Sequence, residues 1–182
     1  MPVPSTNRVR IIGGRHRGRV LRFPGVPEAR PTPDRVRETL FNWLGQDLSG
    51  RTTLEPYAGT GAMSLEALSR GAALAVAVDR DAALVRALAD NARLLQEDAL
   101  EVHRADARRF LERETRTFDV IFLDPPFDED PWPWLLPAAT ARLAADGVIY
   151  AEARHAVVAP PGLTVVRQGR AGQVHYHLLA PS

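Results

Sequence analysis

From Thr52 onward the chain alternates short apolar stretches with alanine-rich stretches of helical spacing, and this rhythm restricts its possible folds more than any other feature. Short apolar runs indicate strands, and apolar residues at helical spacing indicate amphipathic helices. A strand that rejoins its sheet through a helix runs parallel to the preceding strand, with a right-handed crossover. The expected strands are 53–57, 75–79, 99–104, 118–124 and 148–152, and the expected helices are 62–70, 81–95 and about 135–143.

Both ends of the chain depart from this alternation of predicted strands and helices. Residues 163–167 and 173–179 are predicted strands joined by a glycine-containing turn, which indicates an antiparallel hairpin. Near the amino terminus, 8–12 and 19–23 alternate arginines with aliphatic residues around three glycines, which predicts a second hairpin. We therefore expect an α/β, Rossmann-like fold. It would be a mostly parallel seven-stranded sheet with helices on both faces, a C-terminal antiparallel hairpin and an N-terminal β-hairpin extension.

A helix is expected between the first hairpin and the sheet. Thr32 is placed to cap it, and Pro33 suits the first helical position because its missing N–H would be unpaired there anyway. Gly45 is expected to end it. The chain would then divide into a basic extension, residues 1–30, and a main domain, residues 31–182.

The amino-acid composition excludes two kinds of catalytic group. The 182 residues include no Cys, and all 23 basic residues are Arg, which excludes thiolate and lysine catalysis. The net charge of +1 hides an asymmetry: residues 1–37 hold nine Arg against Glu28 and Asp34, a balance of +7, which leaves −6 for the rest. A basic arm on an acidic body predicts contact with a polyanion such as nucleic acid. No targeting or membrane segment is visible, so we expect a cytoplasmic protein.

A glycine turn follows the first strand of the sheet. In the segment Glu55–Gly61, Gly59 and Gly61 let a ligand approach the backbone at a helix N-terminus. Asp79, at the end of the next strand, is placed to accept hydrogen bonds from ribose hydroxyls, and Asp106 follows the third strand, where it could meet an adenine amino group. These strand ends predict a nucleoside cofactor pocket.

The turn favours S-adenosylmethionine over a dinucleotide. The dinucleotide fingerprint requires a third glycine where this chain has Ser64. A carboxylate at Glu55 would repel a pyrophosphate but attract the ammonium group of a bound amino acid. No metal is expected, because the histidines have no second ligand at suitable spacing.

The fourth strand leads into Asp124, Pro125, Pro126 and Phe127. An exocyclic amine of a base is a weak nucleophile, because its lone pair is delocalised into the ring. The Asp124 carboxylate and the Pro125 carbonyl can accept its two N–H bonds and direct the lone pair at a methyl donor, while the prolines stiffen the loop. Phe127 offers a stacking face for the base. Trp132 could shape the same pocket or pack in the core, as could Trp134.

Four segments together resemble the bacterial small-subunit ribosomal RNA guanine-N2 methyltransferase family, the RsmD type. They are 10–18 (RIIGGRHRG), 30–44 (RPTPDRVRETLFNWL), the glycine turn with 65–72 (LEALSRGA), and 124–127 (DPPF). The similarity runs from about Arg8 to the last strand pair. It implies a class I fold, S-adenosylmethionine as cofactor, N2-methylguanine in 16S rRNA as product, and small-subunit proteins bound to the substrate rRNA.

The resemblance also implies roles for individual residues of the catalytic loop and the cofactor pocket. The RNA contacts are expected from the charge of the basic arm. The catalytic loop would be Asp124, Pro125, Pro126 and Phe127; the cofactor contacts Glu55, Tyr57, Ala58, Gly59, Gly61, Asp79, Arg80, Asp106, Ala107, Arg35 and Glu38; and the RNA contacts Arg10, Arg15, His16, Arg17 and Arg19. Glu55, Pro56 and Tyr57 stand where the family usually has Asp, an aliphatic residue and Phe. We expect a monomer.

Two other functions fit the same residues. An acid followed by two prolines and an aromatic residue also suits the N6 amine of adenine, in DNA or RNA. An RNA-binding assembly factor that has lost catalysis would keep the basic arm, although the intact glycine turn and Asp124 argue against it.

Overall fold

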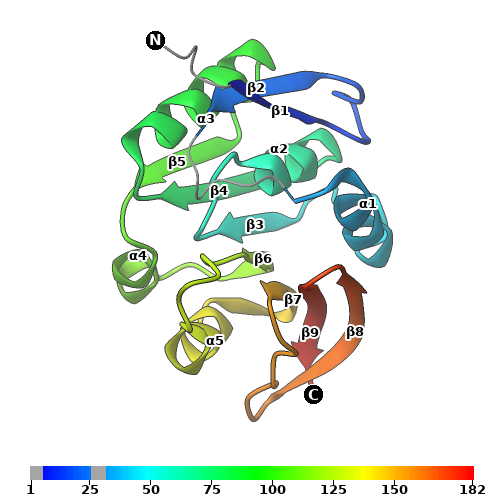
Figure 1. Cartoon of the computed structure of the whole chain (residues 1–182), viewed down its shortest axis with the longest axis vertical. Coiled ribbons are helices and arrows are strands. Elements are labelled where there is room, and N and C mark those ends of the chain that lie inside the picture. Colours follow the sequence, from blue (N-terminus) through cyan, green and yellow to red (C-terminus); the bar gives the residue numbers. More distant parts are fainter. Residues whose placement is uncertain (1–5, 26–31) are drawn as a thin grey trace.

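The central feature of the fold is a seven-stranded sheet in the order β5-β4-β3-β6-β7-β9-β8. The structure is a computed structural model that describes residues 6–25 and 32–182. Figure 1 shows the seven strands stacked in this order. The strands are β3 (Thr52–Glu55), β4 (Leu74–Asp79), β5 (Leu100–Arg104), β6 (Phe118–Leu123), β7 (Leu143–Ala153), β8 (Leu163–Ala171) and β9 (Val174–Pro181).

Strand pairing confirms the predicted topology. β3 pairs in parallel with β4 on one side and with β6 on the other, so the strand order reverses at β3. β9 is antiparallel to both β7 and β8, which confirms the C-terminal hairpin. Ligands of open α/β sheets bind beyond the carboxyl ends of the strands at such a reversal. We call this side of the sheet the catalytic edge; it comprises the residues that follow β3, β4, β6 and β7.

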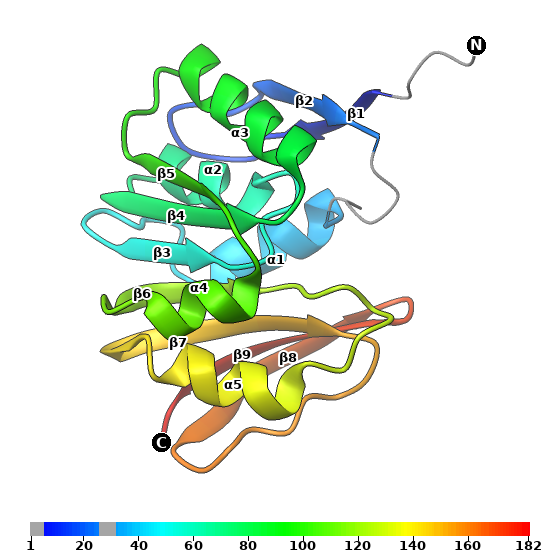
Figure 2. The same cartoon turned by 90° about the vertical axis from the view of Figure 1, so that its left-hand side faces the viewer.

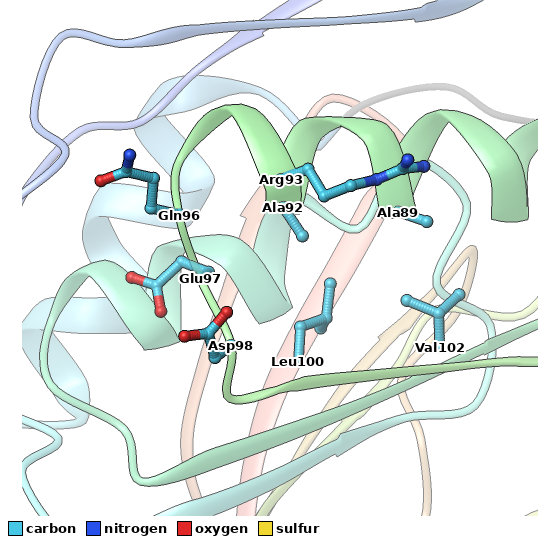
Figure 3. Close-up of a pocket in the computed structure, with 8 residues that line it drawn as sticks. All are labelled: Ala89, Ala92, Arg93, Gln96, Glu97, Asp98, Leu100 and Val102. Atoms are coloured by element: carbon cyan, nitrogen blue, oxygen red, sulfur yellow. The ribbon is translucent and has the colours of Figure 1, made fainter.

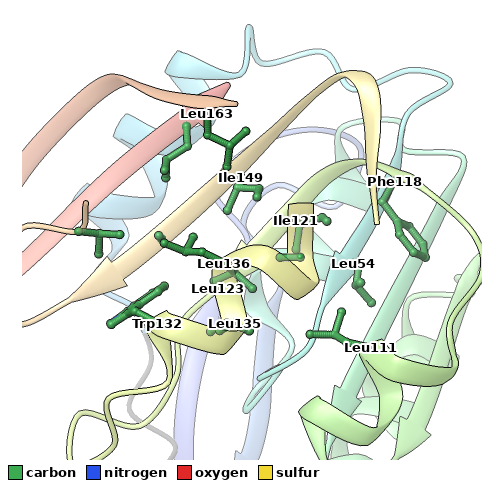
Figure 4. Packing of buried hydrophobic residues seen from close by; sticks show 14 of the residues in the cluster. Leu54, Leu111, Phe118, Ile121, Leu123, Trp132, Leu135, Leu136, Ile149 and Leu163 are labelled. Carbon is green, nitrogen blue, oxygen red and sulfur yellow. The ribbon is translucent and has the colours of Figure 1, made fainter. Parts of the chain in front are cut away.

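Helices cover both faces of the sheet (Figures 1 and 2). One face carries α1 and α2, whose apolar residues pack with Ala75, Phe122 and Tyr150. The other carries α4 and α5, and Figure 4 shows their core, in which Leu111 and Leu135 meet Ile121 and other strand residues. The helices are α1 (Asp34–Trp43), α2 (Ala62–Ser69), α3 (Ala82–Leu94), α4 (Ala107–Arg113) and α5 (Trp132–Thr140).

The N-terminal hairpin is β1 (Thr6–Arg10) paired with β2 (Val20–Pro24), and it packs against α3. Its alternation sends Val9, Leu21 and Phe23 inward, where they are at most 4% exposed, while the arginines between them face outward. The hairpin turn is bonded to the end of α2, since the Arg15 N–H donates to the Ser69 carbonyl at 2.8 Å. The extension is therefore docked on the main domain along its length.

Several boundaries differ from the sequence prediction. Pro33, not Thr32, occupies the N-cap position of α1, and no side chain caps that helix. The helix expected at about 135–143 begins earlier, at Trp132, because Pro131 and Pro133 suit a helix start. β7 begins at Leu143, well before the expected strand, and α4 was missed because seven residues are too few to show a periodic pattern.

The fold does not test the expected division of the chain into an extension and a main domain. The boundary between residues 30 and 31 lies outside the described residues, as does Arg30. Among the residues that the structure describes, no helix is both long enough and apolar enough to span a bilayer.

Candidate functional site

The glycine turn between β3 and α2 lies at the catalytic edge. Gly59 and Gly61 have φ of +55° and +72°, which other residues adopt only with strain. A Cβ on Gly61 would overlap Leu88 of α3, whereas one on Gly59 would enter open space. Gly61 thus serves helix packing, while Gly59 leaves the outer side of the turn free for a ligand. Ala58, which lies between β3 and Gly59 in the sequence, is buried and donates its N–H to the Val78 carbonyl at 2.9 Å.

Asp79 ends β4 and holds this turn in place. Its Oδ2 accepts from the Gly59 N–H at 2.9 Å, and its Oδ1 accepts from the Asp81 N–H at 2.9 Å. The predicted ribose acceptor is therefore oriented by two backbone donors. Each carboxylate oxygen keeps a second acceptor position, so Asp79 can still bind two hydroxyls.

Glu55, the last residue of β3, is buried rather than at the lip of the turn. Its Oε1 accepts from both the N–H and the hydroxyl of Ser64, at 3.1 and 2.7 Å. Burial raises the pKa of Glu55 to about 8, against the opposing effect of the Ser64 hydrogen bonds. Its Oε1 is thus directed at the N-terminal turn of α2. A contact with a cofactor ammonium group stays a prediction.

Asp106 and Tyr57 lie close together at the neighbouring strand end. Asp106 is exposed and caps α4, since its Oδ1 accepts from the Arg109 N–H at 3.1 Å, and Ala107 begins that helix. Tyr57 is half-buried, and burial together with the nearby charge of Asp106 raises its pKa while Arg80 opposes the shift. The structure thus brings together four of the predicted cofactor contacts, Tyr57, Arg80, Asp106 and Ala107.

The catalytic loop meets an acidic residue that the sequence analysis missed. Asp124 follows β6, and the register of β6 and β7 places its carboxyl group beside that of Glu152 of β7. Glu152 is 4% exposed, and its Oε1 accepts from the hydroxyls of Tyr150 at 2.6 Å and Thr32 at 3.2 Å. Burial raises the pKa of both carboxyl groups, and for Asp124 the negative charges of Glu152 and Glu55 raise it further.

The remaining loop residues become more exposed along the chain. Pro125 is buried and Pro126 half-buried, and Phe127 is 39% exposed. The Arg154 guanidinium lies 5.0 Å from the centre of the Phe127 ring. An exposed aromatic face beside a cation is a surface on which a base can stack.

The two tryptophans pack in or against the hydrophobic core. Trp132 is 8% exposed and belongs to the core under α5 (Figure 4). Trp134 packs partly against the same core and lies under the Arg108 guanidinium, 5.1 Å from its ring centre. Of the two alternatives for these residues, core packing is the one that the structure shows.

The α1 segment contributes different residues from those predicted. Arg35 and Glu38 are exposed, and among the described residues neither side chain makes a hydrogen bond or ion pair. Arg37 is instead buried, and its guanidinium donates to the Arg10 carbonyl at 2.9 Å and to Asp34 at 2.7 Å. The role of Arg35 and Glu38 in closing over a cofactor stays a prediction.

The tip of the hairpin lies away from the catalytic edge. Arg15 and His16 both bind Glu97, with a His16 Nε2 to Glu97 Oε1 distance of 2.7 Å. Glu97 lies in the loop before β5, beside a hollow of about 560 Å³ between α3 and β5 (Figure 3). Because β5 begins there, this is the edge of the sheet opposite to Asp124. Arg17 and Arg19 are exposed at the same tip.

The open end of the hairpin lies nearer the reacting groups. Val9 and Phe23 pack with Ala62 and with a leucine in the first turn of α3. Both helices begin at the catalytic edge, directly after the ends of β3 and β4. On the outer face of this end, Arg8 stands directly opposite Arg22, and both are exposed. The sequence analysis counted these two arginines in the basic arm but did not select them as RNA contacts.

Metal-binding groups are absent from the described part of the chain, where no three His, Asp or Glu residues are arranged to hold an ion. The site instead gathers a glycine turn, a hydroxyl acceptor and buried carboxyl groups at one edge of the sheet.

The strand order, the helices on both faces and the glycine turn at the reversal define a class I, Rossmann-like methyltransferase fold. The chain matches the family described as "Conserved hypothetical protein 95" over residues 9–180, and it belongs to this family, the RsmD family.

Relatives of known sequence and structure agree with this assignment. Ribosomal RNA small subunit methyltransferase D from Escherichia coli K12 is 36% identical over 189 residues, which cover 96% of this chain and 90% of the relative. The Haemophilus influenzae protein of the same name is 33% identical over 96% of this chain and 94% of the relative. The solved structure of yhhF from Escherichia coli superposes with a TM-score of 0.87 at 37% identity, covering 97% of this chain and 99% of that one.

Proposed function

We propose that this protein transfers a methyl group from S-adenosylmethionine to the N2 amine of a guanine in 16S rRNA, within an assembled or partly assembled small ribosomal subunit. The observation that carries the proposal is the catalytic loop beside buried carboxyl groups at the edge that also holds the glycine turn. The relatives named above are small-subunit rRNA methyltransferases, which supports an rRNA substrate.

The pocket fits a cationic cofactor. Glu55, Asp124 and Glu152 are carboxyl groups at the ends of three neighbouring strands, and in the described part of the chain none forms an ion pair with a basic side chain. Gly59 leaves room for a ligand on the turn, and Asp79 is oriented to bind hydroxyls. When bound, S-adenosylmethionine supplies a methyl group on a positively charged sulfur.

The chemistry of the loop favours guanine over adenine. Pro125 and Pro126 have no N–H, and together with Asp124 they present carbonyl and carboxyl oxygens to the substrate. Guanine presents the donor N1–H on one side of its N2 amine, whereas the N6 amine of adenine lies between two acceptors, N1 and N7. An acceptor-rich loop therefore suits guanine.

The protein contributes positioning and electrostatics to the transfer. Asp124 and the Pro125 carbonyl accept the two amine hydrogens and hold the nitrogen lone pair in line with the methyl group. The nitrogen then forms the new bond to carbon while the C–S electron pair stays with sulfur, and the proton lost from the amine passes to a carboxyl group or to solvent. Phe127 stacks on the base, and Arg154 contacts the RNA beside it.

The geometry of the hairpin divides its arginines into two groups. Arg8 and Arg22 lie at the end nearer the catalytic edge, so we propose them as the principal RNA contacts, together with the exposed Arg10. Two like charges directly opposite one another destabilise a hairpin, and a bound phosphate would relieve this repulsion. Arg17 and Arg19 would contact RNA only farther from the target base.

The proposal is tested on small subunits isolated from cells that lack this activity. The subunits and, separately, naked 16S rRNA are incubated with the protein and methyl-labelled S-adenosylmethionine, and digested RNA is analysed by mass spectrometry. We expect N2-methylguanine with subunits, little with naked RNA, none with Asp124→Ala, and normal amounts with Asp128→Asn, which alters an exposed acid of the same loop.

Other products would support the alternatives. N6-methyladenine alone would indicate an adenine methyltransferase. No incorporation, together with no increase in thermal stability on adding S-adenosylmethionine, would indicate a non-catalytic RNA-binding factor.

A further inference from the structure

Glu152 stands beside the catalytic loop because of the strand register. β6 and β7 pair in parallel with Leu123 opposite Ala151, so the next residue of each strand, Asp124 and Glu152, lies side by side at the catalytic edge. Residues opposite one another in a sheet project from the same face. The two carboxyl groups are therefore neighbours by construction of the sheet.

The contacts of Glu152 come from two distant parts of the chain. Tyr150, on the same strand, donates its hydroxyl to Glu152 Oε1 at 2.6 Å, and Thr32, just before α1, donates to the same oxygen at 3.2 Å. Two donors on one oxygen restrict the rotation of the carboxyl group. Glu152 is thus held in place by two groups other than Asp124.

A hydrogen bond between the neighbouring carboxyl groups of Asp124 and Glu152 would require a proton. Two carboxylates repel one another, and two carboxyl groups share a hydrogen bond only when one of them is protonated. The titratable groups around the pair are Glu55 from β3, Tyr150 from β7 and Tyr176 from β9, all acids. Burial raises the pKa of both carboxyl groups, and the charge of Glu55 raises that of Asp124 further, whereas the Tyr150 and Thr32 hydroxyls lower that of Glu152. These shifts favour a proton on Asp124, with Glu152 as its acceptor.

We propose that Glu152 is a positioning residue for Asp124: it accepts the proton of the Asp124 carboxyl and so turns the acceptor lone pairs of Asp124 toward the substrate amine. This inference rests on the methyl transfer proposed above. Thr32 and Tyr150 fix Glu152, and through it they fix the direction of the reacting carboxyl group. Without Glu152, Asp124 would be free to rotate and to ionise alone.

The test compares the wild-type protein with Glu152→Gln and with Tyr176→Phe. The Gln side chain keeps the volume and can accept from Thr32 and Tyr150, but it cannot take the proton from Asp124. Tyr176→Phe is the control, because it removes a neighbouring hydroxyl that makes no hydrogen bond to Glu152 among the described residues.

The first readout is the titration of the Asp124 carboxyl carbon by ¹³C NMR, with the resonance assigned by its loss in Asp124→Asn. In the wild type and in Tyr176→Phe it should titrate well above the usual range of an aspartate, and in Glu152→Gln at lower pH.

The second readout is methyl transfer to subunits: kcat should fall roughly 10- to 100-fold in Glu152→Gln with KM for RNA nearly unchanged. Its pH profile should lose the alkaline limb that reports the shared proton.

An unchanged Asp124 titration in Glu152→Gln would overturn the inference. A lower kcat with an unaltered pH profile and lower thermal stability would do so as well, because it would reveal a packing role. If Glu152→Gln does not fold, Thr32→Val removes one donor and should move the Asp124 titration in the same direction by less. Should the titrations behave as expected while the wild-type protein transfers no methyl group, the proposed function fails and the positioning of Asp124 stands.

Discussion

Replacing Glu55 with Gln is expected to make the fold less sensitive to alkaline pH while it weakens cofactor binding. Glu55 is 5% exposed, and both of its hydrogen bonds, from the N–H and the hydroxyl of Ser64, reach the single oxygen Oε1. A Gln side chain presents the same carbonyl oxygen to both donors. The substitution therefore removes the ionisable group and leaves its contacts intact.

The size of the effect follows from proton linkage. Burial raises the pKa of Glu55 from its ordinary 4.5 to about 8. Between these values the folded state keeps a proton that the unfolded state has released, so the free energy of unfolding falls as pH rises. The contribution of protonated Glu55 to the free energy of unfolding is fully present below pH 4.5 and is lost as the pH rises through 8. At about 1.4 kcal/mol per pH unit, the wild type should lose about 2 kcal/mol between roughly pH 6 and 8 through this group.

The assay is urea denaturation of the wild type, Glu55→Gln and a control, Glu101→Gln, at three pH values from about 6 to 8. Glu101 is partly exposed, and its hydrogen bond from Arg116 lowers its pKa, so it stays ionised throughout this range. Other titrating groups are common to all three proteins and cancel in the comparison.

We expect the stability advantage of Glu55→Gln to grow by about 2 kcal/mol across this range while that of the control stays constant. Parallel curves for the wild type and Glu55→Gln would refute the reasoning. In the same samples, the increase in thermal stability on adding S-adenosylmethionine should shrink for Glu55→Gln, because Glu55 can release its proton and pair with the ligand's ammonium group whereas Gln cannot.

Three further outcomes are expected. Replacing both Arg8 and Arg22 with Ala should lower the slope of log K for RNA binding against log salt concentration by roughly 0.7 per lost phosphate contact, as measured by filter binding. The melting temperature, measured by calorimetry, should not fall. Gly61→Ala should cost about 3 kcal/mol in urea denaturation, because it adds overlap with α3 to a positive φ, whereas Gly59→Ala should cost about 1 kcal/mol. Arg154→Lys keeps the charge but loses the planar stacking, and kcat/KM for subunits should fall about fivefold.

Local patterns were sufficient to predict the sheet and which candidate residues lie near one another. Asp79 and Asp124 stand at the ends of apolar strands, Gly59 and Gly61 stand in the turn after another strand, and the carboxyl ends of parallel strands meet at one side of a sheet, so their proximity could be deduced without coordinates. Strand boundaries were predicted less well. β7 begins at Leu143 because pairing with β6 extends it beyond its most apolar part.

The residues that the sequence analysis missed depend on contacts between distant segments. Glu152 becomes a neighbour of Asp124 only through the register of β6 and β7, and Thr32 reaches it from 120 positions away. The sequence did contain one usable indication, an acid at the end of the strand expected after the catalytic loop. The binding of Arg15 by Glu97 had no such indication, because both residues read as ordinary surface charges.

A series of hydrogen bonds joins the basic hairpin to Glu152, the neighbour of Asp124. The Arg37 guanidinium donates to the Arg10 carbonyl of β1 and, at 3.4 Å, to the Thr32 carbonyl, and the Thr32 hydroxyl donates to Glu152. Since Arg37 is 1% exposed, this connection does not compete with water. The backbone of the hairpin is thus tied to the strand that neighbours Asp124. In the proposed reaction, a base placed by the outer arginines would meet an acceptor whose position is already set, so no free energy of binding would be spent on ordering the two parts relative to one another.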